Sequence, residues 1–153
     1  MSETRITVQR TIDAASPQVF DVLSLPQRHP ELDTSGTVVS VDHGDRITAV
    51  GQTFRMNMHA EMMGGDYQTD NHVTGYQENH LLAWETAPAG TEPPGWEWVW
   101  QLEAQGPDAT RVTLTYDWEK VTDPELLKKI SFPLIPAADL EGSLEALAAA
   151  VSG

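Results

Sequence analysis

The residue types that carry most enzyme chemistry are sparse in this chain of 153 residues. It contains no cysteine, which excludes disulfides, thiolate nucleophiles and cysteine-ligated zinc or iron–sulfur sites. Its serines have no neighbouring histidine, and no segment matches a nucleophile elbow, a phosphate-binding glycine loop or a dinucleotide-binding fingerprint. Gly64-Gly65 is not followed by a helix signature, so it predicts a turn. The sequence therefore predicts no cofactor and shows no catalytic motif.

Histidine and glutamate supply the possible metal ligands. His59 and Glu61 are two residues apart on a predicted strand and can share a face, with His72 and His80 conceivably nearby. That face is the predicted solvent side, where a histidine is more often simply solvated, so we predict no metal site. The other two histidines, both in predicted turns, are His29 and His43.

Polar chemistry inside the protein would need a titratable group on an inward face, and the predicted strands offer Arg10, Tyr67 and Tyr116. Two interpretations of Arg10 remain open. Its methylene groups pack against the sheet while its guanidinium reaches water or an acidic neighbour, or its guanidinium points at a ligand. Asn71 either orients a ligand carbonyl or is satisfied by the neighbouring backbone. The catalytic candidates are therefore Arg10 and Tyr116, either of which would polarise a ligand carbonyl.

Aromatic and methionine side chains give the clearer indication of function. The run Trp96-Glu97-Trp98-Val99-Trp100 places three indoles on one face of a single strand. Such side chains either fill a core or line a pocket for a flat hydrophobic ligand, and as a group they favour the pocket. The predicted cavity wall comprises Phe54, Met56, Met58, Tyr67, Asn71, Trp84, Trp98, Trp100, Tyr116, Trp118, Leu140 and Leu144.

The elements that must position these residues follow from hydrophobic periodicity. Alternation over residues 6–12 predicts a first strand, and Ser16-Pro17 opens a short helix that stops near Pro26, with a second turn to Leu32. Further strands are predicted at residues 37–41, 53–59, 67–76, 81–86, 96–102 and 110–120. In the fourth of these seven strands, Gln68, Asp70, His72 and Thr74 are predicted to face water.

A long helix is predicted at the end of the chain. Asp123-Pro124-Glu125 is typical of a helix start, and Pro133 and Pro136 should kink or break the helix before it resumes. Short turns between the strands favour an antiparallel sheet with one solvated face and with the helix covering the other. The apolar stripe of that helix consists of Leu140, Leu144, Leu147 and Val151.

Composition limits the number of domains, the cellular location and the partners that we expect. The length and the 40% hydrophobic fraction suit one globular domain over residues 1–153. No apolar run approaches the ~20 residues of a membrane span, and residues 1–11 do not look like a secretory signal, so we expect a cytoplasmic protein. The net charge of −14 argues against nucleic acid and against stable membrane association.

Several motifs, in their order along nearly the whole chain, resemble the polyketide cyclase/dehydrase branch of the START-like superfamily, also called SRPBCC or helix-grip. They are Ala15-Ser16-Pro17-Gln18-Val19-Phe20, Pro30-Glu31-Leu32-Asp33-Thr34-Ser35-Gly36, Gly51-Gln52-Thr53-Phe54, Leu82-Ala83-Trp84, Trp98-Val99-Trp100 and Thr110-Arg111-Val112-Thr113.

The resemblance implies an α+β helix-grip fold. In such a fold a seven-stranded antiparallel sheet wraps around a long C-terminal helix, two short helices follow the first strand, and a deep, mostly apolar cavity lies between sheet and helix. Members bind or carry lipids, sterols, polyketides and other hydrophobic small molecules, and some are cyclases, aromatases or dehydratases. No catalytic motif is shared across the group, so no catalytic residue transfers to this chain.

Three functions are therefore in view. The leading hypothesis is binding or carrying of a hydrophobic small molecule of lipid, polyketide or aromatic type, which would enter near Pro133 to Pro136 or under the loop at residues 87–95. The alternative is a polyketide cyclase or dehydratase that uses the same cavity. The third is an interaction module whose acidic surface engages a basic partner.

Overall fold

The computed structural model describes residues 5–32, 38–61, 64–93, 95–122, 124 and 137–152. The predicted helix start at Asp123-Pro124-Glu125 and the kink at Pro133 to Pro136 lie outside these residues, apart from Pro124. Along the chain the elements are β1 (Arg5–Ile12), α1 (Ser16–Leu23), the 3-10 helix η1 (Pro26–Arg28), α2 (His29–Leu32), β2 (Val38–His43), β3 (Thr53–Ala60), β4 (Gly65–Gln77), β5 (Leu81–Pro88), β6 (Glu97–Ala104), β7 (Thr110–Asp117) and α4 (Ala137–Ser152).

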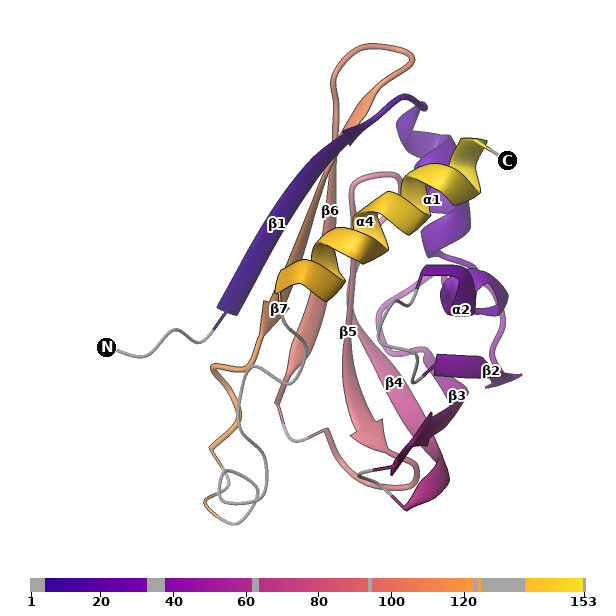
Figure 1. The fold of residues 1–153 in the computed structure, drawn as a ribbon, viewed down its shortest axis with the longest axis vertical. Helices are drawn as coiled ribbons and strands as arrows, with labels where there is room; N and C mark the ends of the chain where they lie inside the picture. Colours follow the sequence, from indigo (N-terminus) through magenta and orange to yellow (C-terminus); the bar gives the residue numbers. More distant parts are fainter. Residues whose placement is uncertain are drawn as a thin grey trace.

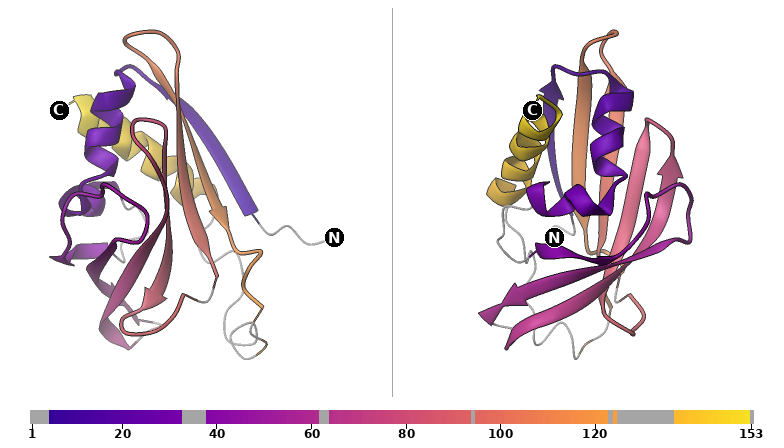
Figure 2. Two further views of the ribbon diagram at one scale, coloured as in Figure 1. Left: turned by 180° about the vertical axis from the view of Figure 1, so that it is seen from behind. Right: turned by 90° about the vertical axis from the view of Figure 1, so that its right-hand side faces the viewer.

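All seven strands belong to one antiparallel sheet in the order β1-β7-β6-β5-β4-β3-β2. The helices α1, α2 and α4 lie on the same face of this strongly twisted sheet, and α4 crosses it obliquely (Figures 1 and 2). The predicted α+β helix-grip fold is confirmed, including the two short helices after the first strand. None of the helices in the described parts of the chain is long and apolar enough to span a bilayer.

Helix α4 buries the stripe that its sequence predicts. Leu140, Leu144 and Leu147 are each at most 1% exposed, whereas Glu141 and Glu145, which flank this stripe, are exposed. The helix packs mainly against β1 and α2. Burying these three leucines removes most of their apolar surface from water, which contributes about 1.5–3 kcal/mol for each side chain. The stripe therefore fixes which face of α4 meets the sheet.

Helix α1 begins at residues that favour a helix N-terminus. The side chain of Gln18 reaches back so that its Oε1 accepts a hydrogen bond from the backbone N–H of Ala15 (3.1 Å), and Pro17 occupies the first turn, where no N–H is needed. The apolar positions of this helix, Val19, Phe20, Val22 and Leu23, are all buried. Helix α1 is thereby held against β6 and α4.

A bulge in β4 changes which of its side chains face inward. The pairing of β4 with β5 shifts between Val73 and Gly75, so Val73 and Tyr76 both lie on the inner face although they are three positions apart, which would place them on opposite faces of a regular strand. Tyr76 packs edge-on against Phe20 of α1, with ring centroids 5.7 Å apart. Strict period-two alternation could not predict this placement.

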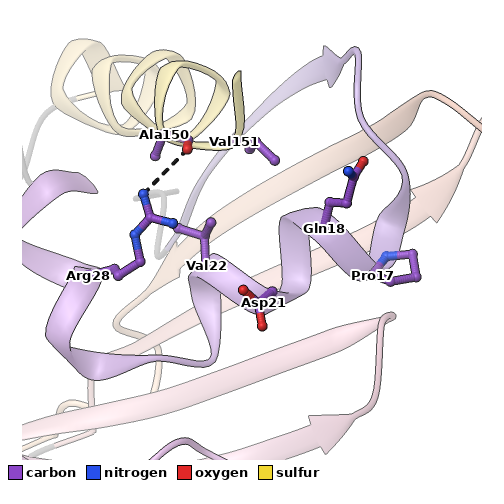
Figure 3. Close-up of a pocket in the computed structure, with 7 residues that line it drawn as sticks. All are labelled: Pro17, Gln18, Asp21, Val22, Arg28, Ala150 and Val151. Carbon is purple, nitrogen blue, oxygen red and sulfur yellow. Dashed lines mark hydrogen bonds between the residues drawn. The ribbon is translucent and has the colours of Figure 1, made fainter. Parts of the chain in front are cut away.

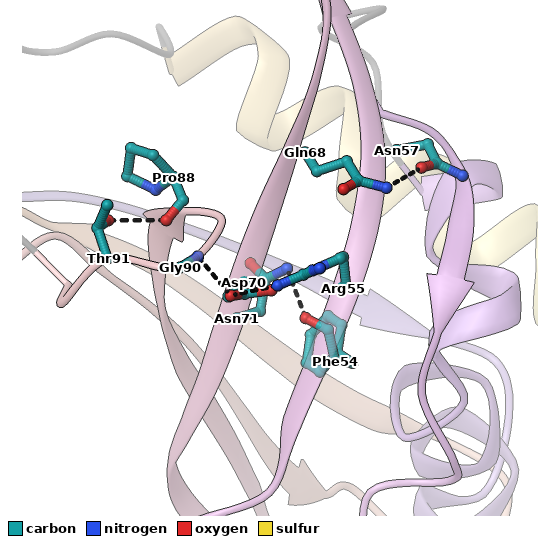
Figure 4. A network of polar contacts seen from close by, with 9 residues as sticks. All are labelled: Phe54, Arg55, Asn57, Gln68, Asp70, Asn71, Pro88, Gly90 and Thr91. Atoms are coloured by element: carbon teal, nitrogen blue, oxygen red, sulfur yellow. Dashed lines mark hydrogen bonds and ion pairs between the residues drawn. The ribbon is translucent and has the colours of Figure 1, made fainter.

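One prediction of solvent exposure is wrong. Asp70 was expected to face water with the polar phase of β4, yet it is only 8% exposed. Arg55 on the neighbouring strand forms a two-pronged ion pair with it, Nε to Oδ1 at 2.7 Å and Nη2 to Oδ2 at 3.0 Å (Figure 4). The paired arginine and a loop amide cover the carboxylate, which sequence periodicity alone does not reveal.

Candidate functional site

The residues predicted to line a cavity come from the inner face of the sheet, from Trp118 just after β7 and from α4. Those that are buried are Phe54, Met56, Asn71, Trp100, Tyr116, Trp118, Leu140 and Leu144. Those that are half-buried are Met58, Tyr67, Trp84 and Trp98. Register explains part of this grouping: one cross-strand row runs Val73, Trp84, Trp98, Tyr116 and Ile6 from β4 to β1.

Three aromatic rings meet at the β6–β7 end of this row. Trp98 stacks on Tyr116 with ring centroids 4.3 Å apart and planes 18° from parallel, and Tyr116 contacts Trp118 at 5.4 Å. Burial raises the pKa of Tyr116 above its ordinary value of 10, so its hydroxyl keeps its proton at neutral pH. None of the described residues hydrogen-bonds to that hydroxyl. Tyr116 is therefore a neutral hydrogen-bond donor within an aromatic surface.

A second group of rings lies at the other end of the row. His29 of α2 stacks on Trp84 with centroids 5.0 Å apart and planes 17° from parallel, and Phe54 meets both rings edge-on. The Nε2 atom of His29 lies 2.7 Å from the carbonyl oxygen of Leu23. Burial lowers the pKa of His29 to about 4, and the bond to Leu23 opposes this only in part.

Sequence reasoning missed His29, which it placed in a turn without further signal. One signal was available: Pro26, His29 and Leu32 are three residues apart, and all three are buried on one side of the η1 and α2 turns. The rings that surround His29 come from β3 and β5, and no local pattern in the sequence predicts that meeting.

The two groups of rings form one surface, which we call the aromatic band: His29, Phe54, Trp84, Trp98, Tyr116 and Trp118. Trp84 and Trp98 are direct cross-strand partners and join its two halves. The band has broad apolar faces, and its polar tips include the hydroxyl of Tyr116 and the imidazole of His29. Such a surface can hold a flat apolar molecule and fix its orientation by a small number of hydrogen bonds.

Asn71 does not add a free polar group to this surface. Its amide Nδ2 donates to the backbone carbonyl of Phe54 (3.3 Å), and its Oδ1 accepts from the hydroxyl of Thr86 (2.7 Å). Neighbouring groups thus satisfy the hydrogen-bonding atoms of Asn71, which leaves none of them to orient a ligand carbonyl. Trp100 differs, because its buried Nε1 has no hydrogen-bond partner among the described residues.

Arg10, the other catalytic candidate, lies apart from Tyr116. It pairs with Val112, whereas Tyr116 pairs with Ile6, four residues along β1 and about 13 Å away at the usual rise of a strand. Arg10 is exposed and lines a hollow of about 290 Å³ between β1 and α4 together with Glu141 and Glu145. The structure therefore does not bring the two candidates together on one carbonyl.

A second hollow, of about 380 Å³, opens between α1, η1 and the end of α4 (Figure 3). Within it Arg28 donates from Nη2 to the carbonyl oxygen of Ala150 (3.4 Å), and its Nε and Nη2 also bind the carboxylate of Glu31. A cation at this end of a helix compensates carbonyls that have no partner within the helix. The hollow contains no residue of the aromatic band.

The possible metal ligands are dispersed. His59 Nδ1 lies 2.8 Å from Asp66 Oδ1 at the exposed end of the β3–β4 hairpin. Among the residues that the structure describes, no three histidine or acidic side chains are placed to hold one metal ion.

The loop between β5 and β6 contacts other segments of the chain near both of its ends. Asp70 Oδ2 accepts a hydrogen bond from the backbone N–H of Gly90 (2.9 Å; Figure 4), and Arg55 and this bond together lower the pKa of Asp70 to about 2. At the other end Gly95 has φ +128°, and a side chain there would meet the backbone of Lys120 at 2.6 Å. The predicted lip is thus hydrogen-bonded to β4 through Gly90 and passes close to the segment after β7 at Gly95.

Comparison with known proteins agrees with this fold. Residues 3–152 match the model of a family described as polyketide cyclase / dehydrase and lipid transport. An uncharacterized protein of Mycobacterium tuberculosis, Rv0088, is 34% identical over 113 residues, which are 72% of this chain and 47% of that protein. The chain spans about half the length of the curated relatives it matches.

Two solved structures illustrate the similarity in three dimensions. A protein from Arthrobacter aurescens superposes with a TM-score of 0.72 at 15% identity, over 97% of this chain and 86% of the other. The Zhui aromatase/cyclase from Streptomyces sp. R1128 superposes with a TM-score of 0.68 at 12% identity, over 97% and 93% of the two chains. At these identities the similarity establishes the shared fold.

Proposed function

Because the chain belongs to the polyketide cyclase/dehydrase and lipid transport family, we propose that it binds or carries a hydrophobic small molecule between its sheet and α4. The ligand is of lipid, polyketide or aromatic type. The observation that carries this proposal is the aromatic band, in which stacked rings face the helices and the polar tip of Tyr116 has no partner among the described residues. A core that served stability alone would not need an unpaired hydroxyl.

The net charge of the protein argues against anionic macromolecular partners. Nine basic residues against 23 acidic ones repel phosphate backbones and anionic lipid surfaces. The protein would thus meet its ligand in solution in the cytoplasm, without stable docking on nucleic acid or membrane.

Intrinsic fluorescence tests the proposal, since Trp84 and Trp98 belong to the band. Titration with fatty acids, sterols and aromatic polyketides is expected to change the tryptophan emission saturably for at least one class. Trp98→Ala should weaken that binding by roughly tenfold or more, because it removes one stacking face. Val50→Ala, at an apolar position that is 59% exposed, is the control and should bind as the wild type does. No saturable change with any class would contradict the proposal.

A cyclase or dehydratase activity is the second candidate, and the hydroxyl of Tyr116 favours it. A neutral donor in an apolar setting can stabilise the charge that develops on a ligand carbonyl oxygen. Under this proposal a polyketide thioester would be turned over by the wild type and by Arg10→Ala but not by Tyr116→Phe. Equal turnover in the wild type and Tyr116→Phe would remove Tyr116 from that role.

A further inference from the structure

We propose that His29 makes the site selective for uncharged, flat ligands that carry a hydroxyl group, by accepting a hydrogen bond from that hydroxyl at Nδ1. This inference rests on the proposed function and names the ligand class within it. It depends on three features of His29: its tautomer, its ring environment and one nitrogen that has no partner among the described residues.

The tautomer follows from the contact with Leu23. A backbone carbonyl can only accept, so the His29 nitrogen that lies 2.7 Å from it must carry the proton. That nitrogen is Nε2, and a neutral ring then bears its lone pair on Nδ1. No described residue donates a hydrogen bond to Nδ1. The imidazole therefore presents one fixed acceptor beside the ring of Trp84.

The surroundings of the ring keep it neutral. His29 is 8% exposed, stacks on Trp84 and meets Phe54 edge-on, and among the described residues no acidic side chain contacts it. Burial disfavours the imidazolium and so lowers the pKa of His29. A ligand carboxylate offers no proton to Nδ1 and would be desolvated without a cation to pair with it. A hydroxyl group instead supplies the proton that this acceptor lacks.

The geometry of the band defines the shape of the ligand. The Trp84 plane lies 17° from that of His29, and the Trp98 plane lies 18° from that of Tyr116, so flat faces occur at both ends of the band. Tyr116 supplies a donor and His29 an acceptor. A polycyclic or aromatic molecule with a hydroxyl at one end and a carbonyl or ether oxygen at the other would satisfy both.

Three pyrene compounds test the selectivity, because they share one apolar body: pyrene, 1-hydroxypyrene and 1-pyrenecarboxylate. The wild type is expected to bind 1-hydroxypyrene about tenfold more tightly than pyrene, as one hydrogen bond allows, and 1-pyrenecarboxylate more weakly than either. His29→Phe keeps a flat ring and should bind pyrene and 1-hydroxypyrene equally. His80→Phe, the same change at an exposed position, should keep the preference.

Nitrogen NMR of the wild type provides a readout that does not depend on how well a variant folds. The free protein should show a protonated Nε2 and an unprotonated Nδ1 on His29. Added 1-hydroxypyrene should shift the Nδ1 resonance in the direction of hydrogen bonding, whereas pyrene should leave it in place. A shift of equal size with both compounds would overturn the inference.

The outcomes separate the inference from the function on which it rests. Binding of pyrene and 1-hydroxypyrene with equal affinity, or tighter binding of the carboxylate, overturns the role of His29 and leaves hydrophobic binding intact. If none of the three pyrene compounds binds, and the fatty acids and sterols do not bind either, the proposed function is wrong. The proposed selectivity is then wrong as well. If fatty acids alone bind, the function stands and the inference is wrong.

Discussion

Replacing Tyr116 with alanine is expected to lower the free energy of unfolding by about 3–5 kcal/mol, the usual cost of truncating a large aromatic residue in a core. The side chain is 1% exposed, stacks on Trp98 and contacts Trp118, so its removal leaves a cavity that its neighbours cannot close without moving strands β6 and β7. Urea denaturation followed by far-ultraviolet circular dichroism measures this change.

Tyr116→Phe is the matched control for this prediction. It removes only the hydroxyl, which no described residue hydrogen-bonds, so the free energy of unfolding should stay within about 1 kcal/mol of the wild type. The same variant should lose affinity for ligands that carry a carbonyl group. A stability loss in Tyr116→Phe as large as that in Tyr116→Ala would mean that the hydroxyl is structurally paired, and the role of Tyr116 as a free donor would be wrong.

Acidification should destabilise the protein through His29, by about 3 kcal/mol between pH 6.5 and pH 4. The pKa of His29 is about 4 in the folded protein and 6.5 in an unfolded chain. The unfolded state therefore binds a proton first as pH falls, and stability decreases through this window. Above about pH 7.5 the histidine is essentially neutral in both states and contributes no dependence. Denaturation at a series of pH values measures the slope.

His29→Phe isolates this effect from the other titrating groups. Its stability should be offset by a constant amount, because the carbonyl of Leu23 loses its donor, but the wild-type slope between pH 6.5 and pH 4 should disappear. Asp70 affects stability at lower pH than His29 does. Its pKa is lowered from 3.8 to about 2, so its stabilising contribution is lost only as pH falls below about 4. An unchanged slope in His29→Phe would show that another group is responsible.

Much of the fold was predictable because its strands and final helix have strong periodic patterns. The stripe of Leu140, Leu144 and Leu147 has helical spacing and charged neighbours, and the structure buries all three. The alternation in β7 is equally regular, with Val112, Leu114 and Tyr116 buried. Patterns of this kind are local, so one sequence is enough to read them.

The features that sequence reasoning missed all depend on contacts between distant segments. Asp70 is covered by Arg55 and by the amide of Gly90, 15 and 20 residues away in the chain. His29 owes its place in the band to Phe54 and Trp84, which come from two other elements. Pairing of this kind depends on strand order and on the β4 bulge, and neither is encoded in residue type or spacing alone.

The guanidinium of Arg28 connects the short helical turns after α1 with the C-terminal end of α4. It joins the carboxylate of Glu31 in α2 to the carbonyl of Ala150 near the end of α4, and its backbone directly precedes His29. Because Arg28 and His29 are adjacent in the chain, the contact of Arg28 with the end of α4 also restrains the backbone that carries the imidazole.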